Sequence, residues 1–512
     1  MDAQMTIINH EVFDTETEYE WLALFFVHEV PGLKNQMRKV LDNIKKAGIH
    51  PKTAVYMIKD SVRQTLEPLD PPNPNQPGAS MAVNYFTMSV HRLHTNTVTK
   101  VTGWKKVAVK LKNTDPQCWR KGFEFVYSNI RSKRKILMCF SHGAAFGINF
   151  DGEKTMRPGV ARARPAQLAT APPLKLTITS NKYYYFDRAT AATIISRSEG
   201  RDPFKEMIPQ LQNEGLLSKE DGKKMCSRLN ILWISQLADA LKTNLKGKRI
   251  DLMLMNNCYM QSFDTGYLLK DSVDYLVAPE GVLDAIGYDY CAILKKVATG
   301  AVKGRALAES VIPAYEKYFT DSGEASFQAG QAVFANKLGA YPDALRLFNQ
   351  FLDVLKAKMD TIIEALFEIR ENKIQYVSAD ADTDGANTMD MIDVISWIDL
   401  VFEALPELFS GLTLKQEMDV LRGELIVAGS VGKNLTDKDA VNPKKFGYSG
   451  ISIFYPAYSD LPDLQPAAWC AYFGNMIPSE WEASWKCFLA QYYHGVDILK
   501  NRQGAVLAAT PK

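Results

Sequence analysis

Three short runs of apolar residues constrain the fold of this chain more than any other feature. They are Trp21–Val30 (WLALFFVHEV), Lys135–Phe140 (KILMCF) and Ile250–Met255 (IDLMLM). Continuous apolar runs of this length are typical of strands that are buried on both faces of a parallel sheet. The segments Leu33–Ala47 and Ile231–Leu245 place apolar residues at helical spacing. This alternation predicts an α/β sandwich with a mainly parallel central sheet.

The chain is long enough for more than one domain. It has 512 residues, whereas a single hydrophobic core rarely serves more than about 250–300. We expect an α/β domain over residues 1–300. We expect residues 301–512 to be mainly helical, since helical patterns cover Ala344–Arg370 and Met389–Leu405, and also to contribute to the sheet.

Two segments look like insertions into this pattern. Residues Leu66–Pro77 are rich in proline and predict a loop. Residues about 150–228 begin with Arg157-Pro158-Gly159 and regain a regular pattern only towards their end. We expect the start of this second segment to be exposed.

Composition and charge exclude several classes of protein. Hydrophobic residues make up 46% of the chain and charged residues 23%, which fits a globular protein with a large core. A formal net charge of +2 does not predict a partner nucleic acid. No run of about 18 apolar residues predicts a membrane span. The first residues lack the apolar core of a signal peptide, and the compartment stays open: secreted or periplasmic if a leader was removed, otherwise cytoplasmic.

The cysteines predict neither a disulfide framework nor a zinc site. There are seven of them, scattered along the chain and never spaced as CxxC. This leaves room for one reactive thiol among several buried structural ones.

Two of the apolar runs end in side chains that can do chemistry. Phe140-Ser141-His142-Gly143 closes one run and Asn256-Asn257-Cys258 closes another. In a parallel sheet, reactive groups gather beyond the carboxyl ends of the strands. A thiol before a helix has its thiolate stabilised, and a nearby histidine can pass a proton to a leaving amine. The backbone N–H groups of Gly143 and Cys258 are candidates to hold a tetrahedral oxyanion.

A simpler interpretation of these two residues stays open at this point. A lone cysteine after an apolar strand is usually a small buried hydrophobic residue. A second His-Gly pair occurs at His494-Gly495. The chain would then be an unrelated α/β enzyme or binding module. A phosphate-binding glycine loop after the first strand would favour that interpretation, but Pro31-Gly32-Leu33 does not form one.

The pattern around the two residues resembles the clostripain-like cysteine peptidases, relatives of caspases, legumains and gingipains. The resemblance extends over most of the chain in scattered blocks: Leu237–Gln261, Ser272–Gly281, Gly287–Leu294, Asn387–Trp397, Gly447–Pro456 and Trp485–Tyr493. It implies a caspase-like α/β/α fold and a protein or peptide substrate. It also implies hydrolysis through a thioester acyl-enzyme, with Cys258 as nucleophile, His142 as acid/base partner and no required cofactor.

The residues expected in the specificity pocket depart from the family's pattern. Family members commonly carry Asp two positions before the nucleophile, at the base of a pocket for Arg or Lys. This chain has Asn256 there, and a neutral amide cannot pair with a buried cation as a carboxylate does. Glu280 is the candidate to supply the charge instead. Whether the chain cleaves after basic residues is therefore an open question. The alternative is a catalytically inactive homologue that binds peptides or a partner protein.

Two further expectations concern processing and calcium. Family members are often activated by cleavage between the histidine and the cysteine, and the insertion offers Arg162 as a basic processing site; a solvated basic loop is the other interpretation. Asp380–Gly385 resembles the start of a calcium loop. The twelfth position is Met391, where a bidentate Glu is needed, so a plain acidic turn is the competing interpretation.

Overall fold

The structure is a computed structural model. It describes residues 4–7, 17–29, 33–48, 50–68, 80–93, 98–108, 116–144, 147–148, 232–299, 304–328, 330–374, 376–377, 391–436, 447–458 and 479–509. The predicted insertion at about 150–228, the candidate processing site Arg162 and the acidic segment Asp380–Gly385 lie outside the described residues. The expectations placed on them stay predictions.

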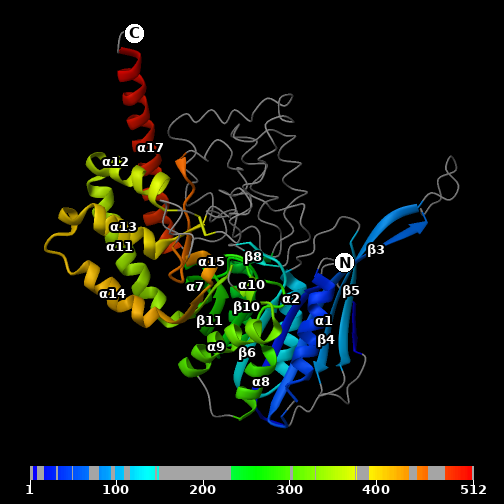
Figure 1. The fold of residues 1–512 in the computed structure, drawn as a ribbon. Helices are drawn as coiled ribbons and strands as arrows, with labels where there is room; N and C mark the ends of the chain where they lie inside the picture. The colour runs from blue at the N-terminus through cyan, green and yellow to red at the C-terminus, as the bar shows by residue number, and fades with distance from the viewer. Residues whose placement is uncertain are drawn as a thin grey trace, which may run out of the picture.

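Ten of the described strands form one sheet (Figure 1), in the order β1-β5-β4-β3-β2-β6-β10-β11-β12-β14. The five central strands are parallel to one another: β3 (Thr53–Pro68), β2 (Tyr19–Glu29), β6 (Ser132–Phe140), β10 (Ile250–Asn256) and β11 (Val273–Pro279). The flanking strands are antiparallel: β4 (Ser80–Leu93), β5 (Val98–Ala108) and β1 (Gln4–Ile7) on one side, and β12 (Ala332–Lys337) and β14 (Ile426–Val431) on the other. The three apolar runs are thus the adjacent strands β2, β6 and β10.

Helices cover both faces of the sheet. One face carries α1 (Lys34–Lys45), α8 (Tyr290–Thr299) and α9 (Arg305–Ser322), and the other α2 (Pro116–Asn129), α6 (Ile234–Leu245), α7 (Phe263–Leu269) and α11 (Tyr341–Ala357). Successive side chains of a strand point to opposite faces. Accordingly, Leu24 and Met253 join one core, while their neighbours Phe25 and Leu254 join the other. The predicted α/β sandwich with a parallel centre is confirmed.

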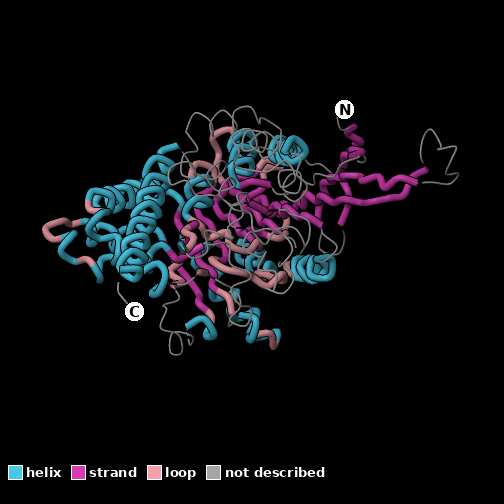
Figure 2. Tube along the Cα trace, turned by 90° about the horizontal axis from the view of Figure 1, so that it is seen from above, coloured by secondary structure: helices cyan, strands magenta, loops and turns pink. Residues whose placement is uncertain are grey.

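The C-terminal region adds helices beside the sandwich. They are α10 (Ala325–Gln328), α12 (Met359–Glu368), α13 (Val394–Ala404), α14 (Leu414–Leu425), α15 (Lys433–Thr436) and α17 (Ser479–Ala509). Buried aromatic rings of Trp397, Tyr455, Trp485 and Phe488 pack together at their centre. Figure 2 shows most of these helices at one end of the molecule and the long strands β3 and β4 extending from the other. The predicted boundary near residue 300 stays a prediction.

Two small sheets lie outside the large one. An antiparallel ribbon pairs β13 (Met391–Asp393) with β15 (Ser452–Phe454). A three-stranded sheet joins β7 (Gly143–Ala144), β8 (Gly147–Ile148) and β9 (Leu232–Trp233). The first of these strands begins directly after His142. No helix in the described part of the chain is long and apolar enough to cross a membrane.

Several predicted boundaries are wrong. The predicted loop at Leu66–Pro77 begins too early, because β3 continues to Pro68 while it pairs with β4. The predicted helix at Met389–Leu405 begins only at Val394, because Asp393 ends a strand and accepts a hydrogen bond from Ser396 N as the helix N-cap. The predicted helix at Ala344–Arg370 is broken at Lys358 into α11 and α12.

Candidate active site

Cys258 lies on the turn between β10 and α7 and is half-buried. The next residue, Tyr259, has a φ of 61°, a left-handed conformation that costs a non-glycine residue about 1–3 kcal/mol. Its backbone N–H donates to the Gly281 carbonyl at 2.7 Å, which holds the turn in place. α7 begins at Phe263, capped by the Ser262 hydroxyl. Cys258 thus lies outside the first turn of this helix, where the helix dipole stabilises a thiolate only weakly.

His142 is brought to the same edge of the sheet. β6 and β10 are parallel neighbours, and their last residues, Phe140 and Asn256, are register partners. His142 follows two positions later and is half-buried. Gly143 lies directly on the peptide between Asn257 and Cys258: a Cβ at Gly143 would be 2.5 Å from the Cys258 carbonyl oxygen and 2.6 Å from its nitrogen. Such distances do not occur, so this approach requires glycine.

Asn257 holds the two strand ends together, a role that the sequence analysis missed. Its side chain is buried, and its Nδ2 donates to the Ser141 carbonyl at 3.0 Å and to the Ser141 hydroxyl at 2.7 Å. Both bonds fix the segment that carries His142 relative to the segment that carries Cys258. The only signal in the sequence was a polar residue at the end of a buried strand.

The surroundings of Cys258 favour a protonated thiol in the free protein. Burial raises the pKa of Cys258 above its ordinary range, and the nearby Asp284 carboxylate adds to the rise. A backbone hydrogen bond with Leu283 opposes it most, followed by those from the N–H groups of Cys258 and Gly143, because N–H donors favour the thiolate. The same two N–H groups were the predicted oxyanion donors. A thiol in this state needs a base to become a nucleophile.

Asn256 is buried beneath the loop that follows β11. Its Nδ2 donates to the Ala285 carbonyl at 2.9 Å, and its side chain also hydrogen-bonds Tyr290. Gly287, at φ 60°, approaches so closely that a Cβ there would be 2.4 Å from Asn256 Nδ2. These contacts fix the position of the 281–289 loop beside Cys258.

Glu280 points away from this loop. Its carboxyl group is fully buried and accepts a hydrogen bond from Gly450 N at 3.0 Å. Burial raises the pKa of Glu280 well above its ordinary value. The charge of Asp393 and a hydrogen bond to Asp393 add to this rise. A neutral carboxyl group facing the C-terminal ribbon gives no support to the prediction that Glu280 supplies the charge of the specificity pocket.

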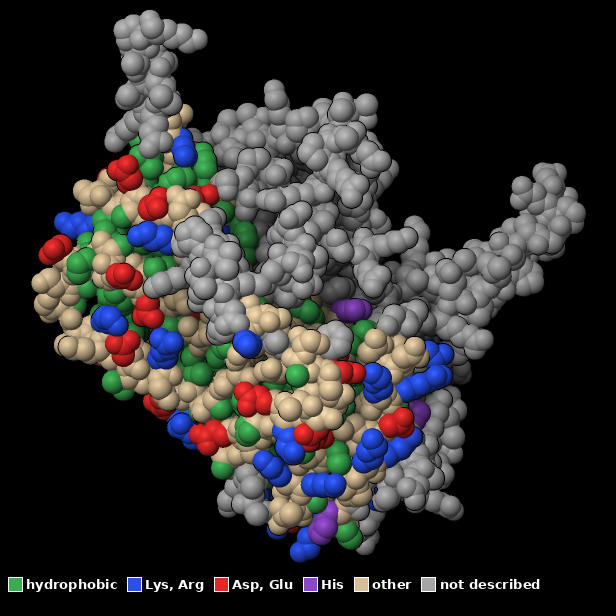
Figure 3. All heavy atoms as spheres, viewed as in Figure 1, with side chains coloured by type: hydrophobic (Ala, Val, Ile, Leu, Met, Phe, Trp, Pro, Cys, Tyr) green, Lys and Arg blue, Asp and Glu red, His purple; other side chains and the backbone are tan. Residues whose placement is uncertain are grey.

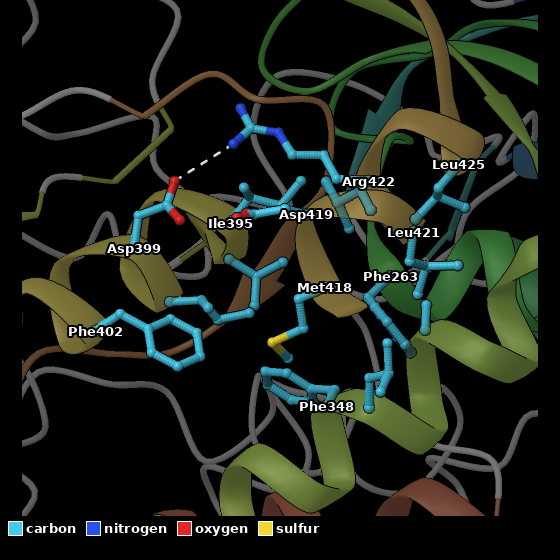
Figure 4. A pocket seen from close by; sticks show the side chains of 15 residues that line it. Phe263, Phe348, Ile395, Asp399, Phe402, Met418, Asp419, Leu421, Arg422 and Leu425 are labelled. Atoms are coloured by element: carbon cyan, nitrogen blue, oxygen red, sulfur yellow. Dashed lines mark hydrogen bonds and ion pairs between the residues drawn. The ribbon is translucent and has the colours of Figure 1, made fainter. Parts of the chain in front are cut away.

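An apolar pocket lies beside α7 (Figure 4). Its volume is about 70 Å³, and Phe263 of α7, Phe348 of α11 and Met418 of α14 contribute to its walls. Asp399 and Arg422 form an ion pair of 3.4 Å at its side. Neither Cys258 nor His142 lines this pocket.

The described surface carries charges of both signs. On the face shown in Figure 3, Lys and Arg side chains lie among Asp and Glu side chains. Some are paired, such as Lys133 with Glu20 at 3.1 Å. The described residues hold no cluster of three or more His, Cys, Asp or Glu side chains that fits a metal ion.

Comparison with known families identifies the chain's relatives. The model of the clostripain family matches residues 223–481, about half of the chain. The chain belongs to the clostripain family. It is therefore a cysteine-type peptidase, a hydrolase whose substrates are proteins or peptides. The matched range includes Asn256, Cys258 and Glu280 but not His142, whose assignment depends on the geometry above.

One solved structure supports the fold. An inactive zymogen C11 protease from Parabacteroides distasonis is similar with a TM-score of 0.51 and 12% identity, over 90% of this chain and 99% of that one. A secreted C11 cysteine protease from Bacteroides thetaiotaomicron, iotapain, has a TM-score of 0.48 and 12% identity, over 93% and 99%. No curated protein matches the sequence. At this identity the first likeness supports the shared fold alone.

Proposed function

We propose that this clostripain-family member is an endopeptidase in which Cys258 and His142 form the catalytic dyad. The packing of Gly143 on the Asn257–Cys258 peptide carries the proposal. His142 directly precedes Gly143, and the hydrogen bonds of Asn257 keep the two segments in register.

The dyad accounts for both halves of the reaction. His142 removes the thiol proton, and the Cys258 Sγ attacks the carbonyl carbon of the scissile bond. The N–H groups of Gly143 and Cys258 hold the oxyanion. His142 then gives the proton to the leaving amine, the C–N bond breaks, and a thioester remains. A water molecule, deprotonated by His142, hydrolyses the thioester and restores the thiol. These steps need no cofactor.

The acyl-enzyme can be trapped to test this proposal. The protein would be mixed with a peptide ester, quenched in acid within milliseconds and weighed intact. We expect one adduct with the mass of the acyl group, located on Cys258 by peptide mapping and released by neutral hydroxylamine. Hydrolysis without such an adduct, or an adduct on another residue, would contradict a thioester mechanism at Cys258.

Asp284 is our candidate for recognition of a basic residue at the cleaved bond. Asn256 is neutral and Glu280 is buried away from the loop, whereas the half-buried Asp284 acts electrostatically on Cys258. Its Oδ1 accepts a hydrogen bond from Ile286 N at 2.9 Å, which fixes the side chain. A substrate guanidinium or ammonium group would pair with this carboxylate.

We expect Asp284→Asn to lower kcat/KM for an arginine substrate by about 10–100-fold, the effect of a lost charge-assisted hydrogen bond. The same peptide with citrulline in place of arginine is the control, because citrulline keeps the shape and lacks the charge. Its kcat/KM should change by less than threefold or so. Equal losses for the two peptides would show that Asp284 does not select for charge.

A further inference from the structure

Two buried carboxyl groups meet at the junction between the catalytic sheet and the C-terminal ribbon. Glu280 follows β11, and Asp393 ends β13; both are 0% exposed. Asp393 accepts hydrogen bonds from Ser396 N and Ser449 N. Glu280 accepts one from Gly450 N. These three bonds attach both acids to the C-terminal region.

One proton must be shared between the two acids. Oε1 of Glu280 is buried and has no N–H or O–H partner among the described residues, and the Asp393 carboxyl group lies close enough to act on Glu280 by charge and by hydrogen bonding. Two carboxyl groups bond to each other only if one of them is protonated, because two buried carboxylates in contact repel. Oε2 of Glu280 already accepts the hydrogen bond from Gly450 N. The other oxygen, Oε1, therefore carries the proton and donates it to Asp393.

Among the described residues, no cation balances this pair. In this part of the chain, the ionisable groups that act with Glu280 are Asp393 on the ribbon and Tyr341 on α11; Tyr341 also interacts with Asp264 of α7. All of these are acids. The apolar pocket of Figure 4 lies alongside: Val394 and Ile451, which line it, are sequence neighbours of Asp393 and Gly450. Apolar surroundings and further acids both oppose ionisation.

The pair joins the two segments whose backbone holds the turn of Cys258, here called its supports: residues 279–281 and the C-terminal ribbon of β13 and β15. On one side, Tyr259 N donates to Gly281 O at 2.7 Å and Gln261 N donates to Pro279 O at 2.9 Å. On the other, Ser452 N donates to Gln261 O at 2.9 Å. Glu280 lies in the middle of the first support, and Asp393 is the register partner of Ser452 in the second. The turn of Cys258 is thus held in a closed ring of contacts.

We propose that Glu280 and Asp393 form a proton-sharing pair that positions the nucleophile turn by binding the segment 279–281 to the C-terminal ribbon. Glu280 is then a positioning residue that never touches substrate. Its effect on activity depends on the proposed function, whereas its effect on stability does not.

The pair makes stability depend on pH in a definite direction. In the folded protein the pKa of Glu280 is raised above its ordinary value of 4.5. Its contribution to stability is therefore complete below about pH 4.5 and is lost as pH rises towards the folded pKa, because the unfolded chain gains by ionising first. Above that pKa two adjacent carboxylates repel each other, and the contact between the supports weakens.

Glu280→Gln separates this account from a simple packing role. An amide keeps one donor for Asp393 and one acceptor for Gly450 N but does not titrate. We would measure Tm from pH 5 to pH 9 for wild type, Glu280→Gln and Glu280→Ala. Asp353→Asn, a carboxylate-to-amide change on α11 beside the cation of Lys356, is the matched control.

We expect the Tm of wild type to fall over this range by about 3–6 °C more than the Tm of Glu280→Gln, and the control to follow wild type. Where peptidase activity is measurable, Glu280→Ala should lower kcat at least about tenfold with little change in KM, and Glu280→Gln should recover most of that loss. Parallel Tm curves for wild type and Glu280→Gln would overturn the proposal. So would a Glu280→Ala variant with the kcat of wild type. A chain that proves inactive refutes the dyad but leaves the Tm comparison decisive for the pair.

Discussion

Cys258→Ser is expected to lower kcat/KM for peptide hydrolysis by about 10⁴-fold or more, because removal of a catalytic nucleophile abolishes nearly all of the rate enhancement of the residues that act with it. A serine hydroxyl is a far weaker nucleophile at neutral pH than a thiolate. The change is small in volume, so the turn between β10 and α7 should keep its hydrogen bonds. Tm should change by no more than a few degrees.

The matched control for this variant is Cys291→Ser. Cys291 is also half-buried, and its backbone N–H donates to Asn43 of α1 at 2.8 Å. It should retain the activity of wild type within about twofold. An active Cys258→Ser variant, or an equal loss in both variants, would be incompatible with a unique nucleophile.

Gly143→Ala is expected to lower kcat by about 10²–10³-fold, the cost of losing an oxyanion donor. The reason is geometric: the new Cβ would overlap the Cys258 backbone at 2.5–2.6 Å. Either the N–H of Gly143 or the turn of Cys258 must therefore move. Because the loss occurs mainly in the transition state, KM should change much less than kcat.

Gly339→Ala is the control for this substitution. Gly339 has an ordinary φ, and a Cβ there would meet nothing within 4 Å. The variant should keep both kcat and Tm close to those of wild type. If Gly143→Ala retains full activity, the close approach of the two strand ends is not part of the catalytic machinery.

The central strands could be predicted from the sequence because burial on both faces leaves an unmistakable apolar run. β2, β6 and β10 are such strands, and their parallel order places His142 and Cys258 at one edge. The strands β3 and β4, which also lie inside the sheet, left no such signal along their full length. In β3 the apolar pattern breaks after Ile58 at Lys59 and Asp60, yet the strand continues to Pro68 because its backbone pairs with β4. Pairing between distant segments is not encoded in a local pattern.

Some residues of the candidate site could likewise be predicted from the sequence, and the roles of others could not. Cys258, His142 and Gly143 stand at strand ends, where position alone suggests chemistry. The role of Asn257 depends on contacts with Ser141, 116 positions earlier in the chain. The direction of Glu280 depends on Gly450, 170 positions later. No sequence pattern reports which of two neighbouring loops a side chain faces, so these roles needed the three-dimensional structure.

The rate of Cys258 alkylation tests the central claim most directly. The protein would be treated with a low dose of iodoacetamide at neutral pH and followed by intact mass and peptide mapping, with Cys258→Ser and His142→Gln alongside. The dyad predicts one rapid modification, on Cys258, despite its burial; in His142→Gln this rate should fall to or below that of the exposed Cys487. A Cys258 that reacts no faster than Cys487 in wild type, or equally fast with and without His142, would contradict the account.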